Sequence, residues 1–231
     1  MRTSDPWTPR PTGRELLHEV RTVAGDVPRF LTAPLYRGWH LRWGATPAEV
    51  ATSLPGDDLL ADAQFRATRA VTIDVSAAEV WPWLVQVGCL RAGFYSNDLL
   101  DNLGHPSART LIPELQRLEV GQWVPMSPTP SETTAFRVEA FEVNRWLLWR
   151  KPDSTWVWVL TGLPNGHTRL VTRVVARFEW AKPLSAGLGL ALLELGDFAM
   201  MRRMLLGIKE RAEAVHRSGG RDDGGAGRLL S

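Results

Sequence analysis

A change from strand to helix decides the fold, and it lies in residues 68–88, which read TRAVTIDVSAAEVWPWLVQVG. Over residues 65–75, apolar and polar side chains mostly alternate, as they do in a strand with one buried face. Ser76 and Glu79 then have the spacing of a capping box, and apolar residues follow at three- and four-residue steps. Gly88 marks the expected end of this helix.

Strand patterns dominate the middle of the chain. Before them a short helix is expected, with Ser96 as its N-cap and Gly104 just past its end. Hairpin loops are expected at Asn144-Arg145, from the loop length, and at Asn165-Gly166. The expected strands are Val120 to Val124, Phe136 to Val143, Trp146 to Lys151, Thr155 to Leu163 and Thr168 to Trp180.

The last expected element is a long helix from about Ser185 to Arg217. Its apolar residues follow helical steps and form a stripe about 40 Å long. Glu194 and Asp197 interrupt the most apolar part, and buried carboxylates are costly in a bilayer. The pattern therefore indicates a helix that packs its stripe on the sheet rather than one that crosses a membrane.

The N-terminal part predicts a helical extension over residues 12–60. Two capping boxes, Thr12 with Glu15 and Thr46 with Glu49, indicate helix starts there. The main domain is expected over residues 61–216. Residues 1–11 are polar and rich in proline, and residues 217–231 are polar and rich in glycine, so both ends are expected to be disordered.

The order of strand, two short helices, a run of antiparallel strands and one long helix resembles the START-like superfamily, also called the polyketide cyclase or SRPBCC superfamily. The likeness covers about residues 65–215 and is best at residues 68–88. Residues 91–104, RAGFYSNDLLDNLG, look similar to the second-helix segment of uncharacterised bacterial members. The resemblance implies an α+β helix-grip fold, in which a curved antiparallel sheet wraps around the C-terminal helix and leaves a cavity between them.

Composition narrows the class of protein. The net charge of +2 argues against a nucleic-acid partner, which normally requires a concentrated basic face. Cys89 is the only cysteine, so the chain forms no internal disulfide and no cysteine-based zinc site, and no metal or cofactor is expected. The first residues lack the apolar core of a signal peptide, and these features together fit the cytoplasm.

Aromatic side chains are the main candidates for ligand contacts. The chain has 11 Trp, and each offers a large apolar face with one N–H donor, which suits a ligand pocket. Ordinary core filling is the alternative for each of them. Methionine and leucine on the last helix would add an adaptable apolar wall. The apolar candidates are Trp83, Trp149, Trp158, Phe198, Met201 and Leu205.

A polar segment supplies the other candidates. Asp98 and Asn102 lie in the expected short helix, Tyr95 directly precedes its N-cap, and Glu114 is placed near the pocket rim. On a helix, Asp98 would share a face with Asp101 and His105, and such a set can transfer protons or bind a metal. The favoured alternative is that Asp98 stabilises the first helical turn and that Asp101 and His105 are solvated.

Three arginines, Arg169, Arg173 and Arg177, alternate along one face of the last expected strand. They suit a phosphate or carboxylate site, but a solvated outer face is the favoured interpretation.

The sequence predicts a protein that binds an apolar or amphipathic small molecule, such as a lipid, an isoprenoid or an aromatic polyketide, in an internal cavity. One alternative is a polyketide cyclase or dehydratase-like enzyme that uses Tyr95, Asp98 or His105. Another is docking to a membrane surface or a partner protein through the C-terminal helix.

Overall fold

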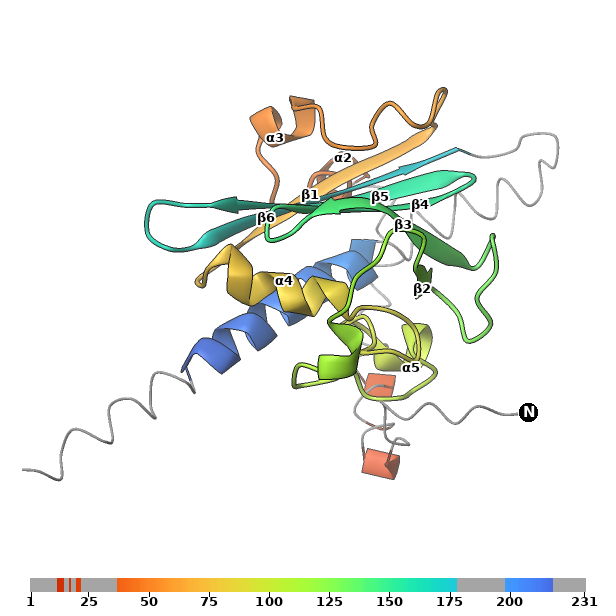
Figure 1. Ribbon diagram of the computed structural model, residues 1–231, viewed down its shortest axis with the longest axis vertical. Coiled ribbons are helices and arrows are strands. Elements are labelled where there is room, and N and C mark those ends of the chain that lie inside the picture. The colour runs from red at the N-terminus through yellow and green to blue at the C-terminus, as the bar shows by residue number, and fades with distance from the viewer. Residues whose placement is uncertain (1–11, 15–16, 18–19, 22–36, 178–197, 218–231) are drawn as a thin grey trace, which may run out of the picture.

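The computed structural model describes residues 12–14, 17, 20–21, 37–177 and 198–217. Its centre is a six-stranded sheet in the order β1-β6-β5-β4-β3-β2, and every neighbouring pair is antiparallel. Strands β2 to β6 follow one another as a meander, and β1 closes the far side against β6 (Figure 1). The strands are β1 (Phe65–Ile73), β2 (Trp123–Pro125), β3 (Ala135–Glu142), β4 (Trp146–Lys151), β5 (Ser154–Gly162) and β6 (Thr168–Ala176).

Helices cover both sides of the sheet (Figure 1). Helix α4 (Ala77–Val85) and the C-terminal helix, described over 198–217, lie on one side, which we call the inner face. The N-terminal elements α2 (Arg37–His40) and α3 (Pro47–Ala51) precede β1, and α3 lies on the opposite, outer face. The short α5 (Asp98–Asp101) and the 3-10 turn η2 (Pro113–Leu115) connect α4 to β2. This is the predicted α+β helix-grip arrangement.

Local signals in the sequence explain where two of these helices begin. The capping box before α4 forms, with the Ser76 main-chain N–H donating to Glu79 at 2.9 Å. The box before α3 also forms, with the Thr46 N–H donating to Glu49 at 2.7 Å. In each helix, the two groups of the box satisfy donors that the first turn leaves unpaired.

The structure corrects one hairpin loop. Strand β3 ends at Glu142, so the connection to β4 has three residues, Val143 included, rather than the predicted Asn144-Arg145 pair. Asn144 takes a positive φ of 61°, a conformation that asparagine adopts more readily than most other residues. Loop length alone did not reveal this residue in the left-handed region.

The second predicted helix is also shorter than expected. It spans only Asp98–Asp101, and Asn97 rather than Ser96 is its N-cap. Tyr95 and Leu103, on either side, have φ angles of 57° and 55°, which do not continue a helix. Therefore His105 does not share a helical face with the acidic residues, and the predicted alignment is wrong.

Several expectations fall outside the described residues. They are the disordered ends at 1–11 and 218–231, most of the helix expected from Thr12 to Ala24, the strand end at Trp180, and the first part of the final helix before Phe198.

The described part of the C-terminal helix buries its apolar stripe. Phe198 and Leu205 are 3% and 0% exposed, which confirms that the stripe faces the protein. Gly207 lies so close to Tyr95 that a Cβ there would be 2.2 Å from the Tyr95 carbonyl oxygen. The helix therefore depends on a glycine at the point where it touches the loop after α4.

The outer face of the sheet contradicts the solvated interpretation of its arginines. Arg173 is buried and donates to the main-chain oxygens of Glu49, Val50 and Thr52 at 2.9, 3.0 and 2.9 Å. Arg169 donates to the Glu49 carboxylate at 2.7 Å. Only Arg177 of the three is exposed. The N-terminal extension covers this face, and Arg169 and Arg173 bind the extension.

Both edges of the sheet are protected by neighbouring segments. At β1, the main-chain N–H groups of Thr68 and Ala70 donate to the oxygens of Leu41 and Trp43 at 2.8 and 3.1 Å. At β2, the Cys89 N–H donates to the Pro125 oxygen at 2.8 Å. An exposed edge is a template for strand addition, so these contacts lower the risk of aggregation.

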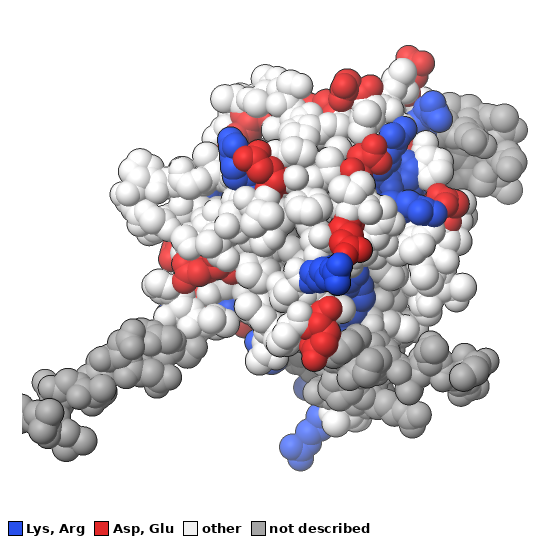
Figure 2. All heavy atoms as spheres, viewed as in Figure 1, with Lys and Arg blue, Asp and Glu red and all other residues white. Residues whose placement is uncertain are grey.

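Surface charge is mixed on the face seen in Figure 2, where acidic and basic side chains are interspersed. Within the described ranges, no helix is both long and apolar enough to cross a membrane.

Candidate ligand-binding site

Strands β4 and β5 bring three tryptophans together on the inner face. Trp149 is paired with Trp156 across the two strands, and Trp158 lies two residues further along β5. Their ring centroids are 5.2 Å apart for Trp149 and Trp156, 5.6 Å for Trp149 and Trp158, and 5.0 Å for Trp156 and Trp158. Trp158 is paired with Thr172, the neighbour of the outward-facing Arg173, so the cluster faces inward.

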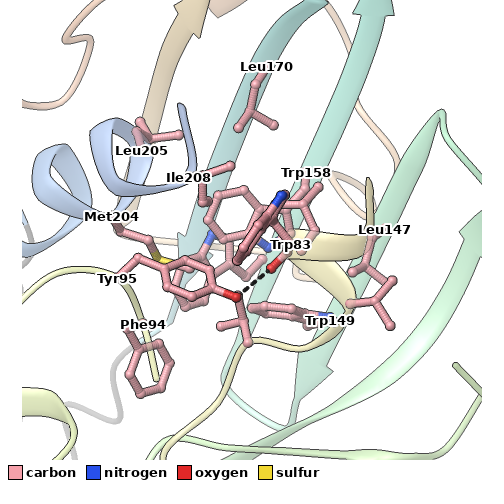
Figure 3. Packing of buried hydrophobic residues seen from close by; sticks show 14 of the residues in the cluster. Trp83, Phe94, Tyr95, Leu147, Trp149, Trp158, Leu170, Met204, Leu205 and Ile208 are labelled. Atoms are coloured by element: carbon pink, nitrogen blue, oxygen red, sulfur yellow. Dashed lines mark hydrogen bonds between the residues drawn. The ribbon is translucent and has the colours of Figure 1, made fainter. Parts of the chain in front are cut away.

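Side chains from α4 and the C-terminal helix face this aromatic wall (Figure 3). Trp83 comes from α4 and packs edge-on against Tyr95, with ring centroids 5.9 Å apart. Figure 3 shows Met204, Leu205 and Ile208 on the C-terminal helix beside the same group. The predicted residues Trp83, Trp149, Trp158, Met201 and Leu205 all belong to one buried cluster.

Phe198, in contrast, lies apart from this cluster. Its ring stacks on His40 with the centroids 4.0 Å apart, and Trp39 approaches to 5.2 Å. The N-terminal extension therefore covers the start of the described part of the C-terminal helix.

The three wall tryptophans differ in how their N–H groups are used. Trp156 Nε1 donates to Thr172 Oγ1 at 2.9 Å, and that hydroxyl in turn donates to the Val157 oxygen at 2.9 Å. Trp149 Nε1 and Trp158 Nε1 are buried and have no acceptor among the residues that the structure describes. Leaving a buried donor unpaired costs about 1–3 kcal/mol, so such groups in native proteins call for an explanation.

Tyr95 is buried and its hydroxyl is already bonded. It donates to the Trp83 main-chain oxygen at 3.1 Å, a contact drawn in Figure 3, and accepts from Gln86 Nε2 at 2.9 Å. Gln86 Oε1 accepts from the Ile112 N–H and from Gln116 at 3.0 Å each. Burial raises the pKa of Tyr95, so the phenol stays neutral. This network ties α4 to the loop that follows it.

Asn102 and Asp98 shape the same loop. Asn102 accepts from the Leu90 N–H at 2.8 Å and donates to the His105 oxygen at 2.7 Å. One oxygen of Asp98 accepts from the Ser107 N–H at 2.8 Å, and the other accepts from the Ser107 hydroxyl. Burial raises the pKa of Asp98, which the bonds from Ser107 oppose. These polar candidates are held by main-chain and side-chain partners within the loop.

Glu114 stands apart from the other polar candidates. It lies on η2 and its side chain is exposed.

Sequence reasoning missed Asn97, whose side-chain polar atoms remain unused. Asn97 is fully buried, and neither Oδ1 nor Nδ2 of its side chain has a partner in the described ranges. Its position inside the polar segment was the only available signal, since burial depends on contacts from outside the segment. Within the described part of the chain, no three His, Cys, Asp or Glu side chains gather as a metal site would require.

Solved structures with a similar fold include protein MLL2253 from Mesorhizobium loti, at 16% identity over 64% of this chain and 97% of that chain, with a TM-score of 0.34. CalU16 from Micromonospora echinospora is 18% identical over 64% of this chain and 84% of that chain, with a TM-score of 0.30. The Polyketide_cyc-like protein Cgl2372 from Corynebacterium glutamicum is 15% identical over 72% of this chain and 97% of that chain, with a TM-score of 0.34.

At such identities the likeness concerns the fold alone, and the fold assignment rests on the strand order and the C-terminal helix. The sequence matches no protein-family model and no curated protein.

Proposed function

We propose that this chain binds an apolar or amphipathic small molecule between the inner face of the sheet and the C-terminal helix. The observation that carries the proposal is the aromatic wall with two buried indole donors, Trp149 Nε1 and Trp158 Nε1, for which the described residues provide no acceptor. A bound molecule would supply the missing partner. Lipids, isoprenoids and aromatic polyketides belong to the proposed range of ligands.

Burial would provide most of the affinity in such a site. Removing apolar surface from water contributes about 25 cal/mol per Å², and a few polar groups fix the orientation of the ligand. The proposed apolar contacts are Trp83, Trp149, Trp158, Met201 and Leu205. Tyr95, Asp98 and Asn102 would support the site by fixing the loop after α4.

Binding is better supported than catalysis or surface docking. The Tyr95 hydroxyl and both Asp98 oxygens already have protein partners, so neither is poised for proton transfer. The described part of the C-terminal helix turns Met201, Leu205, Ile208 and Ala212 inward, which leaves these residues unavailable to a membrane or a partner.

Extraction of purified full-length protein with organic solvent, followed by mass spectrometry, tests the proposal directly. We expect a small molecule in stoichiometric amount, or an empty protein that apolar compounds stabilise against heat. Ligand at 100 times its Kd adds about 2.7 kcal/mol, which for a chain of this size raises Tm by about 5–10 °C.

Two variants of adjacent helix residues locate the site. Leu205→Trp adds bulk at a fully buried position facing the wall, and it should prevent binding. Leu206→Trp makes the same change at the next, partly exposed position and should leave binding intact. The proposal fails if no molecule is extracted and no apolar compound raises Tm, or if both variants bind like the natural protein.

A further inference from the structure

Tryptophans with and without a hydrogen-bond acceptor for the indole N–H lie next to each other on the inner face. Trp156, Trp149 and Trp158 share one wall, and all are nearly inaccessible to water. The protein provides an acceptor, Thr172, to Trp156 alone. The residue type is the same in all three, so the difference lies in the acceptor, which the described residues do not provide for Trp149 Nε1 and Trp158 Nε1.

The unused groups on this wall are donors. Indole has one N–H donor and no acceptor, so its partner must supply an acceptor atom. A pure hydrocarbon would leave both donors unpaired at full cost. The centroids of the two rings are 5.6 Å apart, a separation that one small molecule can span.

The charges on this face favour an uncharged acceptor. Two neutral donors compensate poorly for removing a carboxylate or phosphate from water. Arg69 is a buried cation on the same face, but it lies on the edge strand β1, where its Nε donates to the His40 oxygen at 2.9 Å. Trp158 on β5 lies two strands away from it, with Thr172 in register between them, and Trp149 on β4 lies three strands away.

We infer that the ligand of this site is an uncharged carbonyl compound, a ketone or quinone with an apolar skeleton, whose oxygen atoms accept hydrogen bonds from Trp149 Nε1 and Trp158 Nε1. The inference rests on the proposed function, and it narrows the ligand from any apolar molecule to one with a neutral acceptor at its buried end.

Matched probes isolate the carbonyl group. Fluorene and 9-fluorenone share one ring skeleton and differ in a single carbonyl, and fluorene-9-carboxylate carries a charge instead. Their affinities are measured by quenching of tryptophan fluorescence in the full-length protein. We expect 9-fluorenone to bind about tenfold more tightly than fluorene, the effect of one net hydrogen bond, and the carboxylate to bind no better than fluorene.

Phenylalanine variants assign the donors. Trp149→Phe and Trp158→Phe each remove an N–H group together with part of a ring. For each variant, the ratio of its affinity for 9-fluorenone to its affinity for fluorene is therefore compared, rather than either affinity alone. The preference for 9-fluorenone should fall to about threefold or less in at least one of them. Trp156→Phe, the matched control, should keep the full preference because its N–H is already bonded to Thr172.

A second measurement observes binding to the natural protein, so its result does not depend on whether a variant folds. In the natural protein, 9-fluorenone should move the indole N–H proton resonances of Trp149 and Trp158 downfield, and fluorene should not. The resonances are assigned by their loss in the corresponding variants.

The outcomes separate the two proposals. Equal binding of fluorene and 9-fluorenone overturns the carbonyl inference and leaves small-molecule binding intact, as does tighter binding of the carboxylate. A preference that survives in both Trp149→Phe and Trp158→Phe also overturns it. If neither neutral probe binds and no molecule is extracted from the protein, the proposed function fails and the inference with it.

Discussion

At the scale of single residues, Glu49 shows how one side chain can join two distant parts of the chain. It closes the capping box of α3 and also accepts from Arg169 on β6 at 2.7 and 2.9 Å. The hydrogen bonds from Arg169 lower the pKa of Glu49 from 4.5 to about 2, with burial acting in the opposite direction. The carboxylate is therefore stabilised in the folded protein more than in the unfolded chain.

This shift predicts a specific response to acid. Because the folded pKa is lower than the unfolded one, the stabilising contribution of Glu49 is complete above pH 4.5 and is lost as the pH falls toward 2. Glu49→Gln should be less stable than the natural protein at pH 7, and the difference should shrink across that range. Urea unfolding at a series of pH values measures it. A difference that stays constant from pH 7 to 2 would contradict the assignment.

Gly207 makes a second prediction at this scale. A methyl group there would meet the Tyr95 carbonyl oxygen at 2.2 Å, and main-chain atoms move only if the helix shifts. Gly207→Ala should therefore lower the free energy of unfolding by about 1–3 kcal/mol, although alanine favours helices. Gly162→Ala is the control, because its added methyl group meets nothing within 4 Å. Equal stability of the two variants in urea would contradict the prediction, because it would show that the helix and the loop at Tyr95 move apart at little cost.

At the scale of elements, the outer face of the sheet is an interface with the N-terminal extension. Arg173 is the centre of this interface, since it donates to main-chain oxygens in the last turn of α3 and at its C-cap. It also forms an ion pair with Asp57. Thr68 on β1 accepts from its Nε at 2.8 Å. One side chain thus connects two strands with the extension.

The three arginines of β6 and its end are predicted to differ in importance. Removing one partner of a buried charged pair costs about 3–5 kcal/mol, and Arg173→Ala should lose that much stability. Arg177→Ala should change stability by less than about 0.5 kcal/mol, because its side chain is exposed. Chemical denaturation of both variants compares them. Similarly small losses of stability in the two variants would contradict this prediction and support the interpretation of a solvated face.

At the scale of the whole molecule, we expect the extension and the helix-grip core to fold as one unit. Removing residues 1–60 would expose Arg173 and uncover the β1 edge at Thr68 and Ala70. We expect this shortened chain to aggregate or to melt at a much lower temperature. Removing residues 218–231, which are polar and rich in glycine, is the comparison and should change Tm little. Scattering and thermal melts distinguish the cases, and a stable, monomeric chain from residue 61 onward would refute the prediction.

The sequence by itself determined the order and type of the main elements. Capping boxes at Ser76 and Thr46, strand alternation after Phe65 and the stripe that includes Leu205 are local or periodic features. Such features act between residues within one turn of helix or along one strand, so they are readable without the fold. The aromatic composition of the proposed site was readable for the same reason.

The tertiary structure alone decided which polar groups are satisfied. Arg173 bonds an oxygen 121 residues away, and Trp156 finds its acceptor on the neighbouring strand while Trp149 and Trp158 find none among the described residues. The loop around Tyr95 is likewise held by contacts with Gln86 and the C-terminal helix, and the helix within it spans only Asp98–Asp101. Hydrogen-bond partners and burial depend on segments brought together by folding, and no local pattern records them.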